Sequence, residues 1–111
     1  MRIQIDFGEP IFPVAIAQQI SPNDLNDFYC TASDFDKSNI FFMLLASMHH
    51  YEDQQQTELA AHLSYLIACY LFITLTPPGS GNLALHYINK AIELNPCDEY
   101  LDWLKLMNKG N

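Results

Sequence analysis

A long apolar stretch, Leu59–Leu75, is the sequence feature that most constrains how this chain can fold. It reads LAAHLSYLIACYLFITL, and from Leu63 onward only Ser64 and Thr74 have polar side chains other than tyrosine hydroxyls. A helix of this composition has no polar face to turn toward solvent, so it has to be buried on all sides. The stretch is therefore either a membrane span or the central helix of a helical domain.

Several properties favour the central helix. The stretch has about 17 residues, which is at the lower end of the length needed to cross a bilayer. It contains His62, and it lacks the flanking Lys or Arg residues that usually anchor a span. Phe41–Ala46 and Leu83–Leu94 offer apolar surfaces against which it can pack. We therefore expect a buried helix in a soluble protein, with no membrane segment.

Length and charge limit the possible classes of protein. The 111 residues are 50% hydrophobic and 13% aromatic, which is sufficient for one folded domain over residues 1–111. Thirteen acidic and 5 basic residues give a net charge of −8, and no Lys or Arg lies between Lys37 and Lys90. Because nucleic-acid binding depends on Lys and Arg at the phosphates, we exclude nucleic acid as a partner. The negative charge suits a basic protein partner, or serves only solubility.

The residues that could carry chemistry form no recognisable site. Cys30, Cys69 and Cys97 are too widely spaced for a CxxC motif, and no secretion signal opens the chain. They indicate free thiols in the cytoplasm. His49 and His50 are adjacent, so on a helix they point about 100° apart and cannot chelate one ion together. We predict no enzyme activity, no catalytic residue, no metal and no cofactor.

The N-terminal residues have the pattern of a short strand pair. Apolar and polar residues alternate over Met1–Phe7, which is the period of a half-buried strand. Gly8–Pro10 would then turn the chain, and Ile11–Ile16 could return as a partner strand, with Pro13 restricting it to an edge. We therefore expect a possible short N-terminal β-strand or hairpin.

Start and stop signals divide the rest of the chain into helices. Ser21 at an N-cap, followed by Pro22 and Asp24, predicts one helix start. The Pro77–Gly81 segment, PPGSG, ends the central helix and forms a loop. The expected helices run over about residues 22–30, 34–51, 58–76, 82–95 and 98–109. The fold class is thus mainly α.

The fourth of these helices contains the sequence KAIELNP, Lys90–Pro96. Its spacing resembles the second helix of a tetratricopeptide repeat, in which alanine, an aromatic residue, alanine and proline recur at fixed intervals, with Ile88 in the aromatic position of this chain. Here those positions are Ala84, Ile88, Ala91 and Pro96. In the family the alanines let two paired helices approach closely, and the proline ends the second helix.

The resemblance extends back to the preceding helix and covers about one repeat, residues 65–96. Tyr65, Ala68, Cys69 and Phe72 match the first helix of a repeat if the PPGSG loop is an insertion. Arrays of such repeats need about three copies to be stable alone, so the other helices must supply packing surfaces. The resemblance implies a compact, tetratricopeptide-like stack of about five antiparallel helices.

The acidic residues fall at the ends of the expected helices. Either they form an ordinary solvated surface, with acids favoured near helix N-termini, or they converge into a docking surface with neighbouring aromatic residues as anchors. The candidate partner-binding residues are Asp34, Asp36, Tyr51, Glu52, Asp53, Glu58, Asp98, Glu99, Tyr100, Asp102 and Trp103.

In overall character the chain is similar to the small acidic immunity proteins that neutralise bacterial toxins. That similarity implies a non-catalytic module that binds a basic, nuclease-type toxin and covers its active site or substrate-binding surface. The alternative is a tetratricopeptide-like adaptor or secretion chaperone that holds a peptide or helix of a partner protein. The sequence leaves the oligomeric state open.

Overall fold

The apolar stretch forms the innermost helix of the structure, a computed structural model that describes residues 8–110. Helix α4 (Thr57–Cys69) continues directly into a π-helical turn, η1 (Tyr70–Thr74). Every residue from Leu63 to Leu71 is buried. By length and composition Thr57–Thr74 could cross a membrane, but 61% of it is buried by the rest of the chain. In this fold the stretch is the core helix.

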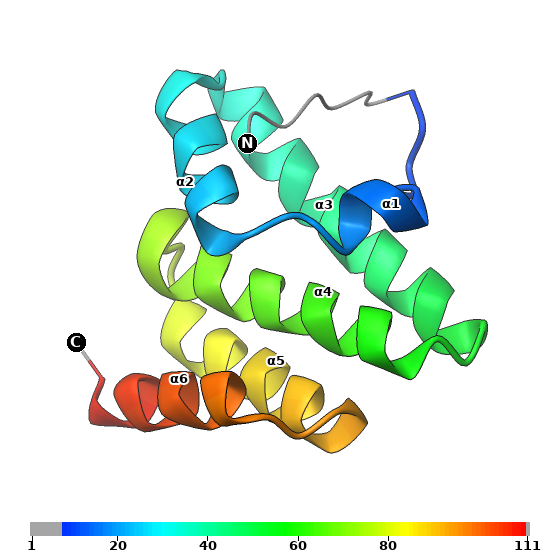
Figure 1. Cartoon of the computed structure of the whole chain (residues 1–111). Helices are drawn as coiled ribbons and strands as arrows, with labels where there is room; N and C mark the ends of the chain where they lie inside the picture. Colours follow the sequence, from blue (N-terminus) through cyan, green and yellow to red (C-terminus); the bar gives the residue numbers. More distant parts are fainter. Residues whose placement is uncertain (1–7, 111) are drawn as a thin grey trace.

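Residues 8–110 form a compact all-α fold of six α-helices, and no strand occurs in that range (Figure 1). The expected helices are confirmed with small changes at their ends. They are α2 (Pro22–Thr31), α3 (Asp34–Asp53), α4 with η1, α5 (Ser80–Leu94) and α6 (Asp98–Lys109). A short additional helix, α1 (Val14–Ala17), precedes them.

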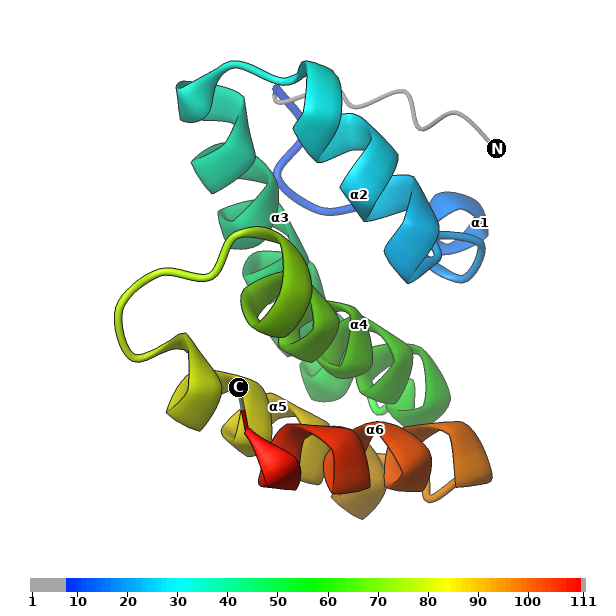
Figure 2. The same cartoon turned by 90° about the vertical axis from the view of Figure 1, so that its left-hand side faces the viewer.

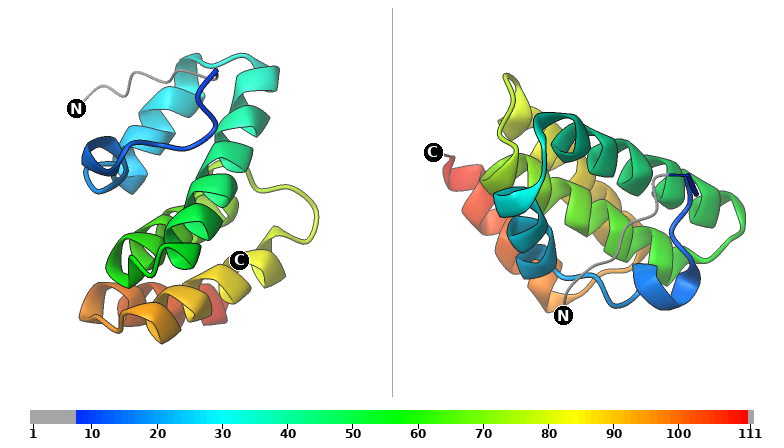
Figure 3. Two further views of the ribbon diagram at one scale, coloured as in Figure 1. Left: turned by 90° about the vertical axis from the view of Figure 1, so that its right-hand side faces the viewer. Right: turned by 90° about the horizontal axis from the view of Figure 1, so that it is seen from above.

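Successive helices from α3 to α6 reverse direction, and each packs against the next (Figure 1). As a result α4 lies between α3 and α5, and α6 packs on α5. Helices α1 and α2 cover another side of the core, where α1 contacts α4 and α2 contacts η1 (Figures 2 and 3). This arrangement explains why α4 needs no polar face.

The predicted return strand over Ile11–Ile16 is wrong, because its second half forms the first turn of α1. Pro13 occupies the N-cap with φ −58° and ψ 151°. Its carbonyl accepts two backbone N–H groups of α1, at 3.0 and 2.8 Å. A proline fixes φ and is well suited to a helix start, so the local signal outweighs the apolar alternation. The other predicted strand, Met1–Phe7, lies outside the described residues.

Side-chain caps fix where α2 and α3 begin. The Asp24 N–H donates to Ser21 Oγ at 3.2 Å, and the Ser21 N–H donates back to Asp24 Oδ2 at 3.0 Å. This reciprocal capping box confirms the predicted start of α2. At α3 a single bond forms the cap, because Ser33 Oγ accepts the Asp36 N–H at 3.2 Å.

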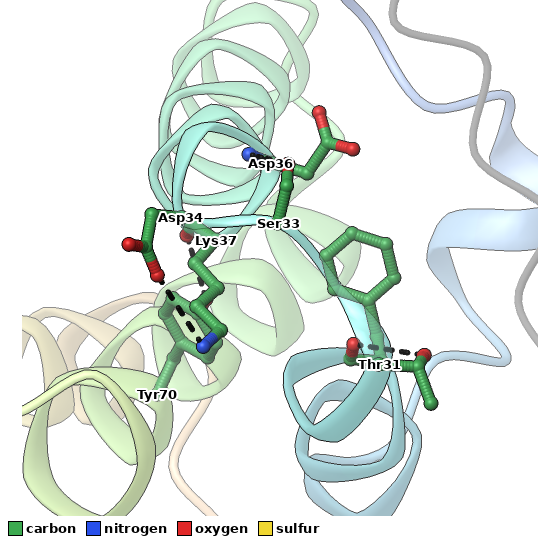
Figure 4. Close-up of polar contacts among 7 residues, drawn as sticks. Thr31, Ser33, Asp34, Asp36, Lys37 and Tyr70 are labelled. Atoms are coloured by element: carbon green, nitrogen blue, oxygen red, sulfur yellow. Dashed lines mark hydrogen bonds and ion pairs between the residues drawn. The ribbon is translucent and has the colours of Figure 1, made fainter.

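The corner between α2 and α3 is tied to the end of the core helix (Figure 4). The Tyr70 hydroxyl donates to the Lys37 carbonyl at 2.6 Å. The Lys37 ammonium lies 3.6 Å from an Asp34 carboxylate oxygen and 4.3 Å from the centre of the Tyr29 ring. Through Lys37 and Tyr70, α2, α3 and η1 are held together at this corner.

Candidate protein-binding surface

Four helix ends meet at one end of the molecule, on the right in Figure 1. They are the C-termini of α3 and α5 and the N-termini of α4 and α6, which alternate because successive helices run in opposite directions. Most of the predicted acidic site residues lie there, and we call this group the acidic end: Glu52, Asp53, Glu58, Asp98, Glu99 and Asp102.

The remaining two predicted acids lie elsewhere. Asp34 and Asp36 are in the first turn of α3, at the opposite end of that helix from Glu52 and Asp53. Carboxylates at a helix N-terminus are stabilised by the helix dipole, and Asp34 also pairs with Lys37. The structure therefore gives these two acids a local role at the α2–α3 corner and does not bring them to the acidic end.

The charge of the acidic end is only partly compensated. The Lys90 ammonium lies 2.9 Å from Glu52 Oε2, and His49 Nδ1 lies 3.9 Å from Glu52 Oε1. The other five carboxylates are exposed and form no ion pair within residues 8–110. One lysine thus faces a group of six acids, and the acidic end is a strongly negative surface.

Tyr51 and Tyr100, predicted as anchors for a partner, are instead core residues, each 5% exposed. The Tyr51 hydroxyl donates to the Phe12 carbonyl, and the Phe12 N–H donates to Ser47 Oγ at 2.9 Å, so Tyr51 ties the N-terminal segment to α3. The Tyr100 ring packs against Tyr65 with centroids 5.0 Å apart. A large aromatic ring gains most from burial in the core, and neither ring is free to contact a partner.

Tyr65 connects the core to the acidic end. Its hydroxyl donates to Glu99 Oε2 at 3.2 Å. Burial raises the pKa of Tyr65 well above its usual value, and nearby Cys69 and Glu99 raise that pKa further. Burial likewise raises the pKa of Tyr100 to about 12. Both phenols stay neutral at physiological pH. The Tyr65 hydroxyl therefore keeps its proton and continues to donate to Glu99, which fixes the orientation of that carboxylate.

A hollow of about 710 Å³ opens beside the acidic end, between α1 and the start of α4. His62 is one of its lining residues. Its Nε2 lies 2.7 Å from the Ile20 carbonyl oxygen and must carry the proton, since a carbonyl can only accept. The lining is mixed polar and apolar, and it consists of Val14, Gln18, Gln55, Gln56, Thr57, Glu58, Leu59, His62 and Asn95. Sequence patterns did not indicate this site, because α1 was expected to be a strand.

A second hollow, of about 180 Å³, lies farther along the same side of the core helix, between α2 and α6. It contains Trp103, the one predicted aromatic anchor that remains partly exposed. The π-helical turn contributes part of the wall, and the Leu75 N–H donates to the Tyr70 carbonyl at 2.7 Å in the i+5 pattern of that turn. The lining residues are Pro22, Asn23, Leu25, Asn26, Cys69, Tyr70, Ile73, Thr74 and Trp103.

The groups that could hold a metal or act as nucleophiles remain separate. Within residues 8–110, no three His, Cys, Asp or Glu side chains are grouped so that they could hold a metal ion. Cys69 is buried, and burial raises its thiol pKa to about 12, whereas Cys30 is exposed. A buried thiol with a raised pKa is a weak nucleophile.

The described residues thus form a negative surface at one end of the molecule and two hollows along one side of the core helix. We found no match for this chain among protein-family models, curated protein sequences or solved structures.

Proposed function

We propose that this chain is a non-catalytic acidic protein-binding module that acts as an immunity protein or antitoxin. Its partner would be a basic, nuclease-type toxin, whose active site or substrate-binding surface it covers. The observation that carries the proposal is the acidic end, where five exposed carboxylates face the solvent and a single lysine pairs with the sixth acid. Such a surface attracts a protein that is itself built to bind phosphate.

The mechanism is electrostatic. Carboxylates at the ends of α4 and α6 occupy fixed positions on rigid helices and imitate the charge of a nucleic-acid backbone. Complementary charge accelerates association by about 10- to 1,000-fold at low salt. Trp103 directly follows Asp102, comes four residues after Glu99 and is partly exposed. It would supply a desolvated aromatic contact of the kind that carries much of the affinity in protein interfaces.

The tetratricopeptide-like arrangement of α4 and α5 is part of the same proposal. Ala84 and Ala91, at the two small positions of the motif, are fully buried in α5, and Ile88 between them is also fully buried. The Ser64 hydroxyl donates to the Tyr87 carbonyl at 2.7 Å and links the two helices directly. Close approach of two antiparallel helices through small residues supports the resemblance.

The test begins with capture of the partner from the source cell, using the full chain, followed by mass spectrometry. Association rates with the captured partner are then measured for two triple variants that change the net charge equally. One is Asp98→Asn, Glu99→Gln and Asp102→Asn at the acidic end, and its matched control is Asp27→Asn, Asp34→Asn and Asp36→Asn.

We expect the acidic-end variant to associate at least about tenfold more slowly at low salt, and the control to change by less than about threefold. Wild-type association should also slow steeply as salt increases. Equal effects of the two triples would show that only net charge matters, and an acidic or wholly apolar partner would contradict the proposal.

A second candidate is an adaptor or secretion chaperone that holds a partner's peptide or helix along α4. The specific observation in its favour is the pair of hollows on one side of the core helix, with the exposed Ile73 and the partly exposed Trp103 in the second. Trp103 is the only tryptophan in the chain, so its fluorescence reports on that hollow.

The two candidate functions predict that different variants lose affinity for the partner. If the hollows hold the partner, Ile73→Asp should reduce affinity at least about tenfold and partner binding should shift Trp103 emission, with little dependence on salt. If the acidic end is the site, the triple variant of Asp98, Glu99 and Asp102 should bind the partner more weakly, and Ile73→Asp should leave the affinity nearly unchanged.

A further inference from the structure

The hollow of about 710 Å³ between α1 and the start of α4 is lined by polar side chains that are free to bind a partner. Its volume lies in the usual range of ligand sites, about 300–1,000 Å³. Within residues 8–110, five of the lining side chains form no hydrogen bond and no ion pair. These side chains are Gln18, Gln55, Gln56, Glu58 and Asn95.

The five residues come from distant parts of the chain. Gln18 is the C-cap of α1, and Asn95 is the C-cap of α5. Gln55 and Gln56 connect α3 to α4, and Glu58 lies in the first turn of α4. Because α1, α3 and α5 all pack against α4, the folded chain presents the five side chains together.

The connection between α3 and α4 has a defined shape. The Gln55 N–H donates to the Glu52 carbonyl at 3.0 Å, and the Gln56 N–H donates to the Tyr51 carbonyl at 2.9 Å. These two bonds form a Schellman motif, which places a left-handed residue just after the helix end. Gln55 occupies that position with φ 61°, where glycine is usually favoured. The chain thus has a glutamine side chain in the hollow at a position whose backbone suits glycine better.

The lining offers groups that match a peptide segment with a positive side chain. Each of the four amide side chains has one carbonyl acceptor and two N–H donors, which can pair with main-chain N–H and C=O groups. Glu58 supplies a negative charge, and no Lys or Arg lines the hollow. Val14, which is 42% exposed, and Leu59 add apolar surface for the aliphatic stem of a long side chain.

The electrostatics of the hollow also favour a cation. The N-terminus of α4 contributes about half a positive elementary charge, so the full charge of Glu58 outweighs it. His62 offers no donor at Nε2, because that N–H is already bound to the Ile20 carbonyl. The potential in the hollow is therefore negative, and the neighbouring acidic end strengthens it.

We propose that this hollow binds a short extended peptide segment of the partner, with an arginine side chain that pairs with Glu58. Arginine fits better than lysine, since its planar guanidinium can form two parallel hydrogen bonds with one carboxylate. The four amide side chains pair with the main chain of the same segment. This inference rests on the proposed function, because a basic partner supplies the segment and Glu58 belongs to the acidic end.

The test uses the full chain and a capped tripeptide, acetyl-Gly-Arg-Gly-amide, added to about 20 mM. Backbone amide shifts in NMR spectra locate the binding site, and we expect saturable shifts centred on Gln55, Glu58 and His62. Glu58→Gln should weaken binding at least about tenfold. Glu93→Gln is the matched control, because Glu93 is an exposed acid of α5 outside the hollow, and it should change the affinity less than about twofold.

A tripeptide with citrulline in place of arginine tests the role of charge, because citrulline keeps the size of arginine and lacks its positive charge. It should bind at least about tenfold more weakly. Gln55→Gly separates binding from folding. It should raise the melting temperature, since glycine adopts a positive φ without strain, and yet weaken tripeptide binding at least about threefold. A purely structural role for Gln55 would not produce these two opposite effects.

Shifts that are absent or centred outside the hollow overturn the inference, and so does equal binding of the arginine and citrulline peptides. Equal affinities of Glu58→Gln and Glu93→Gln also contradict it. A captured basic partner that binds Gln55→Gly as tightly as the wild type would overturn this inference alone. Tripeptide binding in the hollow together with an acidic or wholly apolar captured partner would overturn the proposed function alone.

Discussion

Tyr65 of α4 donates a hydrogen bond to Glu99 of α6 across 3.2 Å, and this bond joins the buried core helix to the acidic end. The donor lies on a residue that is 3% exposed, whereas the acceptor belongs to an exposed residue. The contact therefore fixes one carboxylate of the proposed binding surface by means of the core.

Replacing Tyr65 with Phe removes this hydrogen bond and keeps the ring. We expect the free energy of unfolding to fall by about 0.5–1.5 kcal/mol, the usual net contribution of one hydrogen bond. Urea denaturation measures the change. Tyr29→Phe is the control, because the partly buried Tyr29 ring also packs against the core and its hydroxyl has no hydrogen-bond partner within residues 8–110. Equal losses in the two variants would argue against a structural role for the Tyr65–Glu99 bond.

Ser47 and Ser64 are both fully buried, but their replacement by Ala should have different costs. Ser47 Oγ accepts the Phe12 N–H at 2.9 Å, so Ser47→Ala leaves a buried donor unpaired and should cost about 1–3 kcal/mol. Ser64 Oγ donates to the Tyr87 carbonyl, which also accepts a hydrogen bond within α5, so Ser64→Ala should cost about 1 kcal/mol or less. Chemical denaturation measures the free energy of unfolding of both variants. A larger loss in Ser64→Ala than in Ser47→Ala would contradict the prediction.

Thiol modification should distinguish the cysteines by burial. In the native protein at neutral pH, Cys30 is exposed and should react with a thiol reagent, whereas Cys69 is 2% exposed and its pKa is raised to about 12. We expect at least about a tenfold difference in rate, measured by mass spectrometry of labelled peptides. In denaturant the difference should disappear; rapid native labelling of Cys69 would be inconsistent with the packing of α4.

Stability should decrease at alkaline pH. Burial raises the pKa of Cys69 from 9.0 to about 12 and that of Tyr100 from 10.0 to about 12, so the folded state holds these protons more tightly than the unfolded state. The resulting stabilisation is fully present below about pH 9 and is lost as the pH rises toward 12. Melting temperatures between pH 7 and 11 should be level at first and then fall. Tyr100→Phe has one fewer buried ionisable group, so its melting temperature should fall less steeply with pH. An unchanged slope would show that Tyr100 does not contribute to the alkaline loss of stability.

Much of the secondary structure could be predicted because its signals act over a few residues. The Ser21 cap, the PPGSG loop and the apolar run through α4 each specify a helix boundary or a buried helix without reference to distant residues. The prediction of a return strand was wrong for a related reason. Ile11–Ile16 is too short for its apolar spacing to separate strand from helix, and Pro13 favoured the helix.

The candidate site depended on contacts that sequence patterns do not contain. Tyr51 and Tyr100 could have faced either solvent or core, and only the packing of the N-terminal segment on α3 and of α6 beside Tyr65 decided that both are buried. The hollow beside Glu58 likewise requires α1, which lies about 40 residues earlier in the chain.

The sequence by itself determined that Leu59–Leu75 supplies the core helix and that acids occupy the helix ends, because composition and capping are local properties. Continuous burial extends only over Leu63–Leu71, and Ile73 is 53% exposed. The tertiary structure alone decided which helix ends meet. Reversal of direction between α3, α4, α5 and α6 brings Glu58 next to α6 and leaves Asp34 at the other end of α3. That choice arises from the packing of apolar faces between distant helices, which no short segment of the chain specifies.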